Sequence, residues 1–155
     1  MCAKLLLLLV LALPTLTHAA TPTALTTDDI AGLLKPPVHG ARIIALWSLD
    51  CAYCESHLQA LAKLQQAHPR QIELVTVATD SIQQQAAIEA RLKAANMLTW
   101  PARAYADDTP ERINYLLDPQ WGGETPRTLI IHADGRRQHF SGALTPAQLH
   151  IIEAL

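Results

Sequence analysis

The sequence of 155 residues lacks three features: an excess of positive charge, a long apolar run, and enough cysteines to staple a small domain. Its 12 basic and 14 acidic residues give a formal net charge of -2, which provides no broad positive field for a phosphate backbone. Half of the residues are hydrophobic and 17% are charged, as is usual for globular proteins. We therefore expect one globular domain with no nucleic-acid partner.

The first apolar run is too short to be a comfortable membrane span, because a spanning helix needs about 20 apolar residues and this run stops at Pro14. A single lysine precedes the run and small residues follow it. The pattern predicts a secretory signal peptide over residues 1–19, cleaved after Ala19 or Ala20, and therefore an exported, periplasmic protein. An uncleaved membrane anchor is the alternative. Cys2 precedes the run and is expected to be removed with it.

Two cysteines then remain, Cys51 and Cys54, separated by two residues. A bridge between them closes a very short loop, so it stabilises the fold little and its value must be chemical. The pair follows a β-branched apolar run at 42–47 and opens a helical pattern. Unpaired N–H groups and the helix dipole at a helix start favour a thiolate at Cys51, the expected nucleophile. Cys54, about one turn later, can then resolve a mixed disulfide.

The remaining pattern alternates strands and helices, which predicts an α/β fold with parallel pairing. Residues 20–41 are interpreted as an N-terminal arm with a short helix, and residues 42–155 as the main domain. Within that domain we expect strands at 42–47, 72–78, 127–132 and 137–140, and helices at 54–68, 81–96, from 110 and from 146. Asp134-Gly135 is a strong hairpin signal between the last two strands.

Several motifs in this order resemble the thioredoxin superfamily. They are Trp47-Ser-Leu-Asp-Cys51-Ala-Tyr-Cys54 after a strand, and much later Thr125-Pro126 before another strand. Within the superfamily the chain is most similar to the exported TlpA/ResA-like thiol-disulfide oxidoreductases. The resemblance implies a thioredoxin-like fold, a central mixed β-sheet flanked by helices, with Cys51–Cys54 as the redox-active disulfide and no other cofactor. It also implies a cis peptide bond at Pro126, in a loop beside the dithiol.

The same resemblance implies a substrate-binding surface made by Trp47, Tyr53, Thr125 and Pro126, with Thr125 influencing the choice of partner. For Tyr53, a simple role in covering the disulfide is an equal alternative. The partners would be exported proteins that contain disulfides, with a membrane-bound thiol transporter as the source of electrons.

The chain departs from thioredoxin at two positions near the sulfur atoms. Asp50 replaces a tryptophan before the first cysteine, and its carboxylate should oppose thiolate formation while the helix start favours it. Ala45 stands where thioredoxin has a buried acid, which removes one proton acceptor for Cys54. Glu55, Glu124 or a water molecule could replace that acceptor.

The function expected from the sequence is a small monomeric reductase. Residues 79–125 leave no room for the helical insertion that oxidants of the periplasmic disulfide-forming type carry before the cis-proline. A copper-binding or metallochaperone module is the alternative, with His57 joined to the cysteines and His132 or His139 as a further ligand. A redox-inactive adaptor that uses the same groove is a third interpretation.

Overall fold

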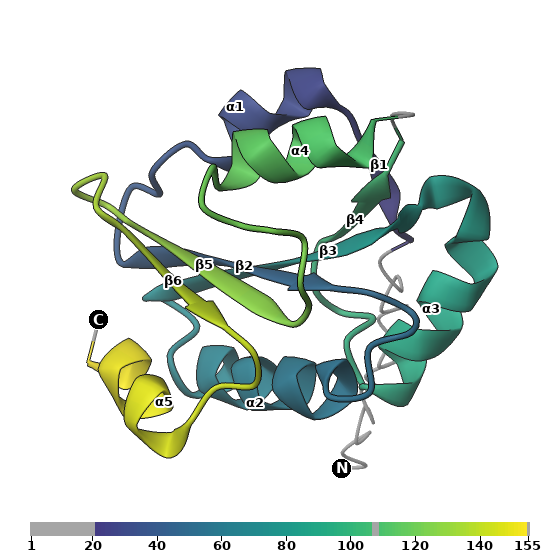
Figure 1. Ribbon diagram of the computed structural model, residues 1–155. Coiled ribbons are helices and arrows are strands. Elements are labelled where there is room, and N and C mark those ends of the chain that lie inside the picture. Colours follow the sequence, from purple (N-terminus) through teal and green to yellow (C-terminus); the bar gives the residue numbers. More distant parts are fainter. Residues whose placement is uncertain (1–20, 107–108, 155) are drawn as a thin grey trace, which may run out of the picture.

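The computed structural model describes residues 21–106 and 109–154 of the chain. Its centre is a mixed sheet of six strands in the order β1-β4-β3-β2-β5-β6 (Figure 1). The strands are β1 (Thr23–Leu25), β2 (Ala41–Trp47), β3 (Ile72–Ser81), β4 (Ala102–Tyr105), β5 (Arg127–His132) and β6 (Arg137–Ser141). The first four strands of the chain pair in parallel, whereas β5 runs antiparallel to β2 and β6 antiparallel to β5.

Helices cover both faces of this sheet (Figure 1). They are η1 (Thr27–Asp29), α1 (Ile30–Leu33), α2 (Cys54–Ala67), η2 (Ile82–Gln84), α3 (Gln85–Ala94), α4 (Pro110–Leu117) and α5 (Pro146–Glu153). One core cluster joins the sheet to α2, α3 and α5, and the other joins it to α1 and α4. The predicted fold class, a mixed sheet flanked by helices, is therefore confirmed.

The central strand β2 feeds both cores because successive side chains of a strand point to opposite faces. Ile43, Ala45 and Trp47 belong to the cluster under α2, whereas Ile44 and Leu46 belong to the cluster under α4. All five side chains are completely buried. The end of β2 is thus fixed from both sides, which makes it a rigid support for the turn that follows.

Two strands were not predicted. β4 lies in the stretch expected to be irregular, and β1 lies in the N-terminal arm, where it pairs in parallel with β4. Both are short, and β4 (Ala-Arg-Ala-Tyr) lacks the β-branched residues that mark β2 and β3. The arm is consequently part of the sheet, while its expected short helix is present as α1.

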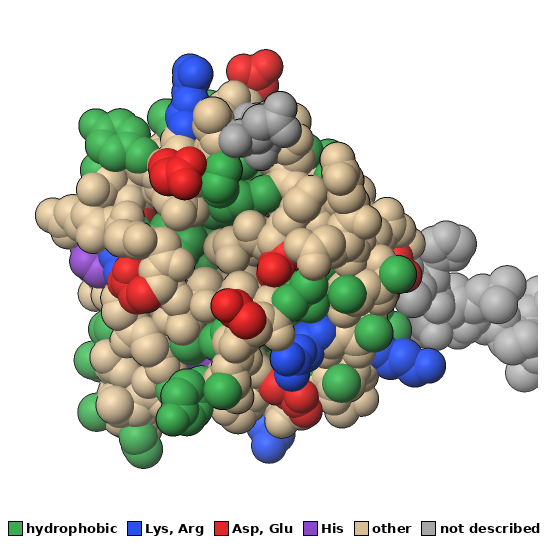
Figure 2. Space-filling model, turned by 45° about the vertical axis from the view of Figure 1, so that its right-hand side comes forward, with side chains coloured by type: hydrophobic (Ala, Val, Ile, Leu, Met, Phe, Trp, Pro, Cys, Tyr) green, Lys and Arg blue, Asp and Glu red, His purple; other side chains and the backbone are tan. Residues whose placement is uncertain are grey.

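The signal-peptide prediction and Cys2 fall on residues outside the described part of the chain. Within 21–106 and 109–154, no helix is long and apolar enough to cross a membrane. One face of the protein shows acidic and basic side chains interspersed (Figure 2), in agreement with the balanced charge of the sequence.

Candidate active site

The cysteine pair lies in the turn between β2 and α2. Cys51 and Cys54 form a disulfide with their Cα atoms 5.5 Å apart, and α2 begins at Cys54. Cys51 is 8% exposed and Cys54 only 1%. The first cysteine is therefore the more accessible one, as a nucleophile must be, and the second lies beneath it.

Hydrogen bonds from two other elements hold this turn in place. The backbone N–H of Leu49 donates to Asp80 Oδ2 at 2.8 Å, near the end of β3. On α3, Arg91 donates to the carbonyl oxygen of Leu49 at 2.8 Å. Within the turn, Ser48 Oγ donates to Asp50 Oδ1 at 2.6 Å, and the N–H of Cys51 donates to the carbonyl oxygen of Ser48 at 3.3 Å. The sulfur atoms are thus carried by a preorganised turn.

The loop before β5 reaches the same turn. The peptide bond between Thr125 and Pro126 is cis, and Thr125 Oγ1 lies 2.8 Å from Ser48 Oγ. Since the single hydroxyl proton of Ser48 is directed at Asp50, Thr125 is the donor in this contact. Two segments 77 residues apart in the sequence therefore meet, and the proline loop lies beside the cysteine turn.

Two residues that the sequence did not single out fix this loop from behind. The guanidinium of Arg127, directly after Pro126, contacts Asp118 Oδ2 through Nε and Nη2, and both side chains are buried. Burial opposes the charge on Asp118, but the hydrogen bonds from Arg127 and the N–H of Gln120, together with the charges of Arg127 and His139, outweigh it, so the pKa of Asp118 lies below its ordinary value. The sequence feature that could have revealed Arg127 is a charged residue at the start of a strand sequence that is otherwise uncharged, Arg-Thr-Leu-Ile-Ile.

The predicted substrate-binding residues do not all share one surface. Trp47 is completely buried and packs in the core cluster that contains both cysteines. It offers no surface to a partner, so its prediction as a substrate-binding residue is wrong; packing under α2 determines its position. Tyr53, by contrast, lies between the two cysteines in the sequence and is 69% exposed. Tyr53, Thr125 and Pro126 stay predictions as contact residues.

Both carboxylates considered as proton acceptors for Cys54 have other partners. Glu55 lies 3.7 Å from Arg91 at the surface. Glu124 accepts from Arg127 at 3.1 Å and from Ser141 at 2.7 Å. Burial opposes the charge on Glu124, but these contacts hold its pKa below the ordinary value.

The histidines proposed as metal ligands each have another partner in the protein. His57 contacts Thr128, His132 contacts Gln138, and His139 lies 3.5 Å from Asp118. Among the residues that the structure describes, no group of three or more His, Cys, Asp and Glu side chains is arranged to hold a metal ion.

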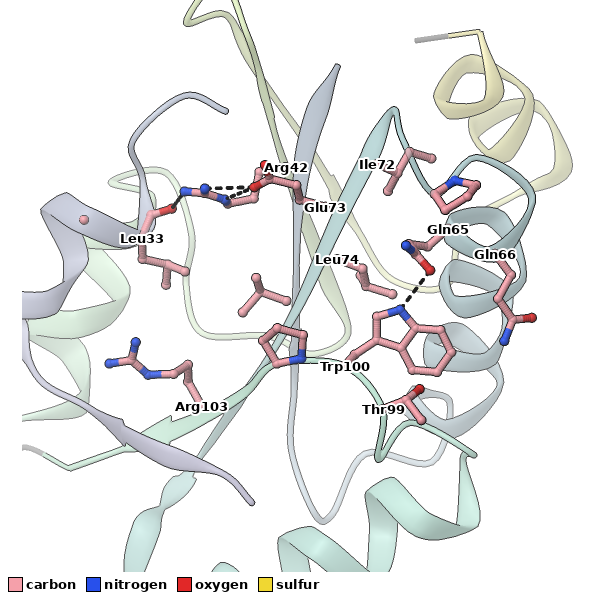
Figure 3. Close-up of a pocket in the computed structure, with 14 residues that line it drawn as sticks. Leu33, Arg42, Gln65, Gln66, Ile72, Glu73, Leu74, Thr99, Trp100 and Arg103 are labelled. Atoms are coloured by element: carbon pink, nitrogen blue, oxygen red, sulfur yellow. Dashed lines mark hydrogen bonds and ion pairs between the residues drawn. The ribbon is translucent and has the colours of Figure 1, made fainter. Parts of the chain in front are cut away.

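A pocket of about 850 Å³ lies away from the disulfide, beside the first half of β3 (Figure 3). Its charged side chains and the indole of Trp100 are already engaged with the protein. Arg42 donates to Glu73, and Trp100 Nε1 donates to Gln65 at 3.0 Å. Arg103 donates to the carbonyl oxygen of Ala24. The pocket therefore presents no free charged group for a ligand.

The fold is similar to several solved structures. A thioredoxin-related protein from Neisseria meningitidis serogroup B is 22% identical, with a TM-score of 0.59 over 88% of this chain and 95% of its own. A thiol:disulfide interchange protein of the thioredoxin family from Chlorobium tepidum is 19% identical, with a TM-score of 0.59 and coverage of 88% and 94%. A secreted disulfide oxidoreductase from Mycobacterium tuberculosis is 18% identical, with a TM-score of 0.56 and coverage of 76% and 83%.

These likenesses establish the thioredoxin-like fold for this chain. No protein-family model and no curated protein sequence matches it.

Proposed function

We propose that this protein is an exported thiol-disulfide oxidoreductase that reduces disulfides of partner proteins through Cys51 and Cys54. The observation that carries the proposal is the position of the disulfide. It lies at the start of α2, with Cys51 the more accessible sulfur, and Thr125 is hydrogen bonded to the turn that carries it. An extended segment of a partner can therefore lie against the proline loop while its disulfide meets Cys51.

The exchange has two steps. In the reduced protein, the thiolate of Cys51 attacks one sulfur of the partner disulfide; a mixed disulfide forms, the partner's S–S bond breaks, and the released sulfur takes up a proton. The thiol of Cys54 then loses its proton and attacks the sulfur of Cys51. The Cys51–Cys54 bond forms, the bond to the partner breaks, and the partner leaves with two thiols. Two electrons pass from this protein to its partner.

The reductase direction is supported by the segment before the cis-proline. In its described part, the segment 82–125 contributes β4, which is a strand of the sheet, and α3 and α4, which pack against the sheet. This segment belongs to the core and does not form a separate helical subdomain. We propose that the protein acts as a monomer on exported proteins and is reduced again by a membrane-bound thiol transporter. Export is supported by the leader pattern and by the secreted relative of the same fold.

Mixed-disulfide trapping in the native cell tests this proposal. With Cys54→Ser, we expect covalent adducts on Cys51 that run as reducible high-mass bands, because the resolving thiol is gone. The matched controls are Cys51→Ser and the double variant, which should give none. The absence of adducts from the Cys54→Ser protein would overturn the exchange mechanism.

The direction is tested by the reduction potential of the purified protein. Thioredoxin lies at about -270 mV and a strong disulfide-forming oxidant at about -120 mV. We expect a value near that of thioredoxin. A value near -120 mV would reverse the proposed direction while leaving the exchange chemistry intact.

A further inference from the structure

Three buried polar atoms on β2, β3 and α2 have no hydrogen-bond partner. Among the described residues, the buried side-chain nitrogen and oxygen atoms without a hydrogen bond are Trp47 Nε1, His57 Nδ1 and Thr76 Oγ1. Trp47 shares a core cluster with both cysteines, and Thr76 lies on the same face of β3 as Leu74 and Ala78 of that cluster. Unsatisfied buried polar groups are uncommon and call for an explanation, which can be a redox or catalytic role.

His57 is the titratable member of this group and is close to the resolving cysteine by helix geometry. It follows Cys54 by three residues on α2, a spacing that puts the two Cβ atoms about 5–6 Å apart. Helical side chains lean toward the helix N-terminus, so helix geometry directs the imidazole toward the turn that carries Cys54. Both residues are buried against the sheet, with Cys54 1% and His57 2% exposed.

The far ring nitrogen of His57 is held by the sheet. Nε2 lies 3.1 Å from Thr128 Oγ1 on β5. Burial lowers the pKa of His57 to about 4, so the ring is neutral at neutral pH and carries one hydrogen. That hydrogen is favoured on Nε2, where it can be donated to Thr128, because a buried N–H without an acceptor costs more than an unused lone pair. Nδ1 is then left with a free lone pair.

The row of strand residues level with Ala45 contains no carboxylate, and Asp80, at the end of β3, accepts a hydrogen bond from the N–H of Leu49. Ala45 pairs in register with Thr76 on one side and Thr128 on the other, so the row of side chains across β3, β2 and β5 is Thr-Ala-Thr. The surrounding charged groups are engaged elsewhere. Asp50 accepts from Ser48, Glu55 and Arg91 face each other, and Arg127 contacts Asp118 beneath the other face.

We propose that His57 is the proton acceptor for Cys54 in the resolving step, with Thr128 holding the imidazole in position. This inference rests on the proposed thiol-disulfide exchange and adds a residue to it. As Cys54 attacks the mixed disulfide, its S–H bond breaks and the proton moves to Nδ1 of His57. The Cys51–Cys54 bond forms, the partner leaves as a thiolate, and the imidazolium returns the proton to that thiolate or to water.

Oxidation of the reduced protein by excess glutathione disulfide tests the proposal, because it separates the two steps. Capture by Cys51 depends on the glutathione concentration, whereas resolution by Cys54 does not. Acid quenching and mass spectrometry report both rates. With His57→Gln, which keeps a donor for Thr128 but no base, we expect capture to change less than twofold. Resolution should slow about 100-fold at pH 7, the lower end of what a positioned general base contributes.

The pH profile separates a proton acceptor from a packing residue. In the wild-type protein, resolution should be nearly independent of pH between 6 and 8, because neutral His57 is available throughout. In His57→Gln, resolution should rise about tenfold per pH unit, because only the ionised fraction of a thiol with an ordinary pKa of about 8.5 reacts. His68→Gln, the same change where α2 ends, is the matched control and should behave as wild type.

The outcomes distinguish this inference from the proposed function. If the wild-type protein forms no glutathione adduct at Cys51, the exchange mechanism itself fails. If adducts form and His57→Gln resolves them with the wild-type rate and pH profile, only the role of His57 fails. Should His57→Gln not fold, Thr128→Val carries the test: it frees the ring, so resolution should slow severalfold with capture unchanged. An unchanged rate in that variant would also overturn the role.

Discussion

The buried ion pair behind the proline loop allows the effect of one substitution to be worked out in size and direction. Arg127→Met removes the guanidinium from a site where its side chain is 4% exposed and that of Asp118 is 7% exposed. Asp118 then keeps only the N–H of Gln120 at 3.0 Å and His139 at 3.5 Å. Leaving one charge of a buried pair without its partner costs about 3–5 kcal/mol. We expect the free energy of unfolding to fall by that amount at pH 7.

Asp118→Asn should cost less, about 1–3 kcal/mol, the range for a disrupted buried hydrogen bond. Arg127 keeps Glu124 and Ser141 as acceptors in that variant, so its charge is still compensated. The double variant should cost less than the sum of the two single changes, because neither charge is left alone. Urea unfolding of the oxidised protein gives the free energy of unfolding of the two single variants and the double variant, provided that its dependence on urea concentration is the same in all of them.

The loss of stability caused by Arg127→Met should also depend on pH, in a direction that follows from the lowered pKa of Asp118. The pKa of Asp118 in the folded protein lies below the ordinary 3.8, so its charge stabilises the fold fully above that value. This contribution is lost as the pH falls below 3.8 and through the lowered pKa. The difference between wild type and Arg127→Met should therefore shrink at pH 3.

A surface pair provides the control. Arg136 and Asp134 are 65% and 57% exposed, so Arg136→Met should leave the unfolding midpoint unchanged. A cost below 1 kcal/mol for Arg127→Met at pH 7, or a cost equal to that of Arg136→Met, would refute the assignment of Arg127 as the anchor of the loop.

Two further predictions concern the backbone and the contact between the turn and the loop. Gly40→Ala should lower the free energy of unfolding by about 3 kcal/mol, because φ is +63° and the new Cβ would clash with the backbone carbonyl oxygen of Gln71. Gly135→Ala, where φ is +85° but no atom lies within 4 Å, should cost only about 1–2 kcal/mol, and equal costs in thermal unfolding would contradict this. Ser48→Ala removes the contact with Thr125; it should cost about 1 kcal/mol and slow partner capture by Cys51 severalfold, measured by the trapping rate. An unchanged trapping rate would show that the contact does not position the loop.

Local patterns in the sequence were sufficient to predict the elements whose own residues show the pattern of a strand, helix or turn. The apolar run of β2, the helix that opens at Cys54 and the Asp134-Gly135 hairpin all lie where the sequence predicts them. In each case the residues that define the element are adjacent or recur with the period of that element. The order of these motifs was then enough to predict the fold.

Elements defined by their partners could not be predicted in this way. The strand character of β4 comes from its parallel pairing with β3 and β1. Trp47 gives the same sequence signal whether it faces a partner or the core, and only the packing of α2 decides between them. The sequence singles out His57 by its spacing to Cys54, but as a metal ligand, because its contact with Thr128 requires the fold.

The alternation of side chains along β5 connects two polar contacts of the site, the ion pair of Arg127 with Asp118 and the hydrogen bond of Thr128 with His57. Arg127 and Thr128 are consecutive residues directly after Pro126, so their side chains point to opposite faces of the sheet. Arg127 meets Asp118 after α4, whereas Thr128 meets His57 on α2. A slip of β5 by one residue against β2 would exchange these faces and place the arginine under the disulfide. The register that aligns Thr128 with Ala45 therefore fixes both the loop that a partner would contact and the side chain that would orient the proton acceptor of Cys54.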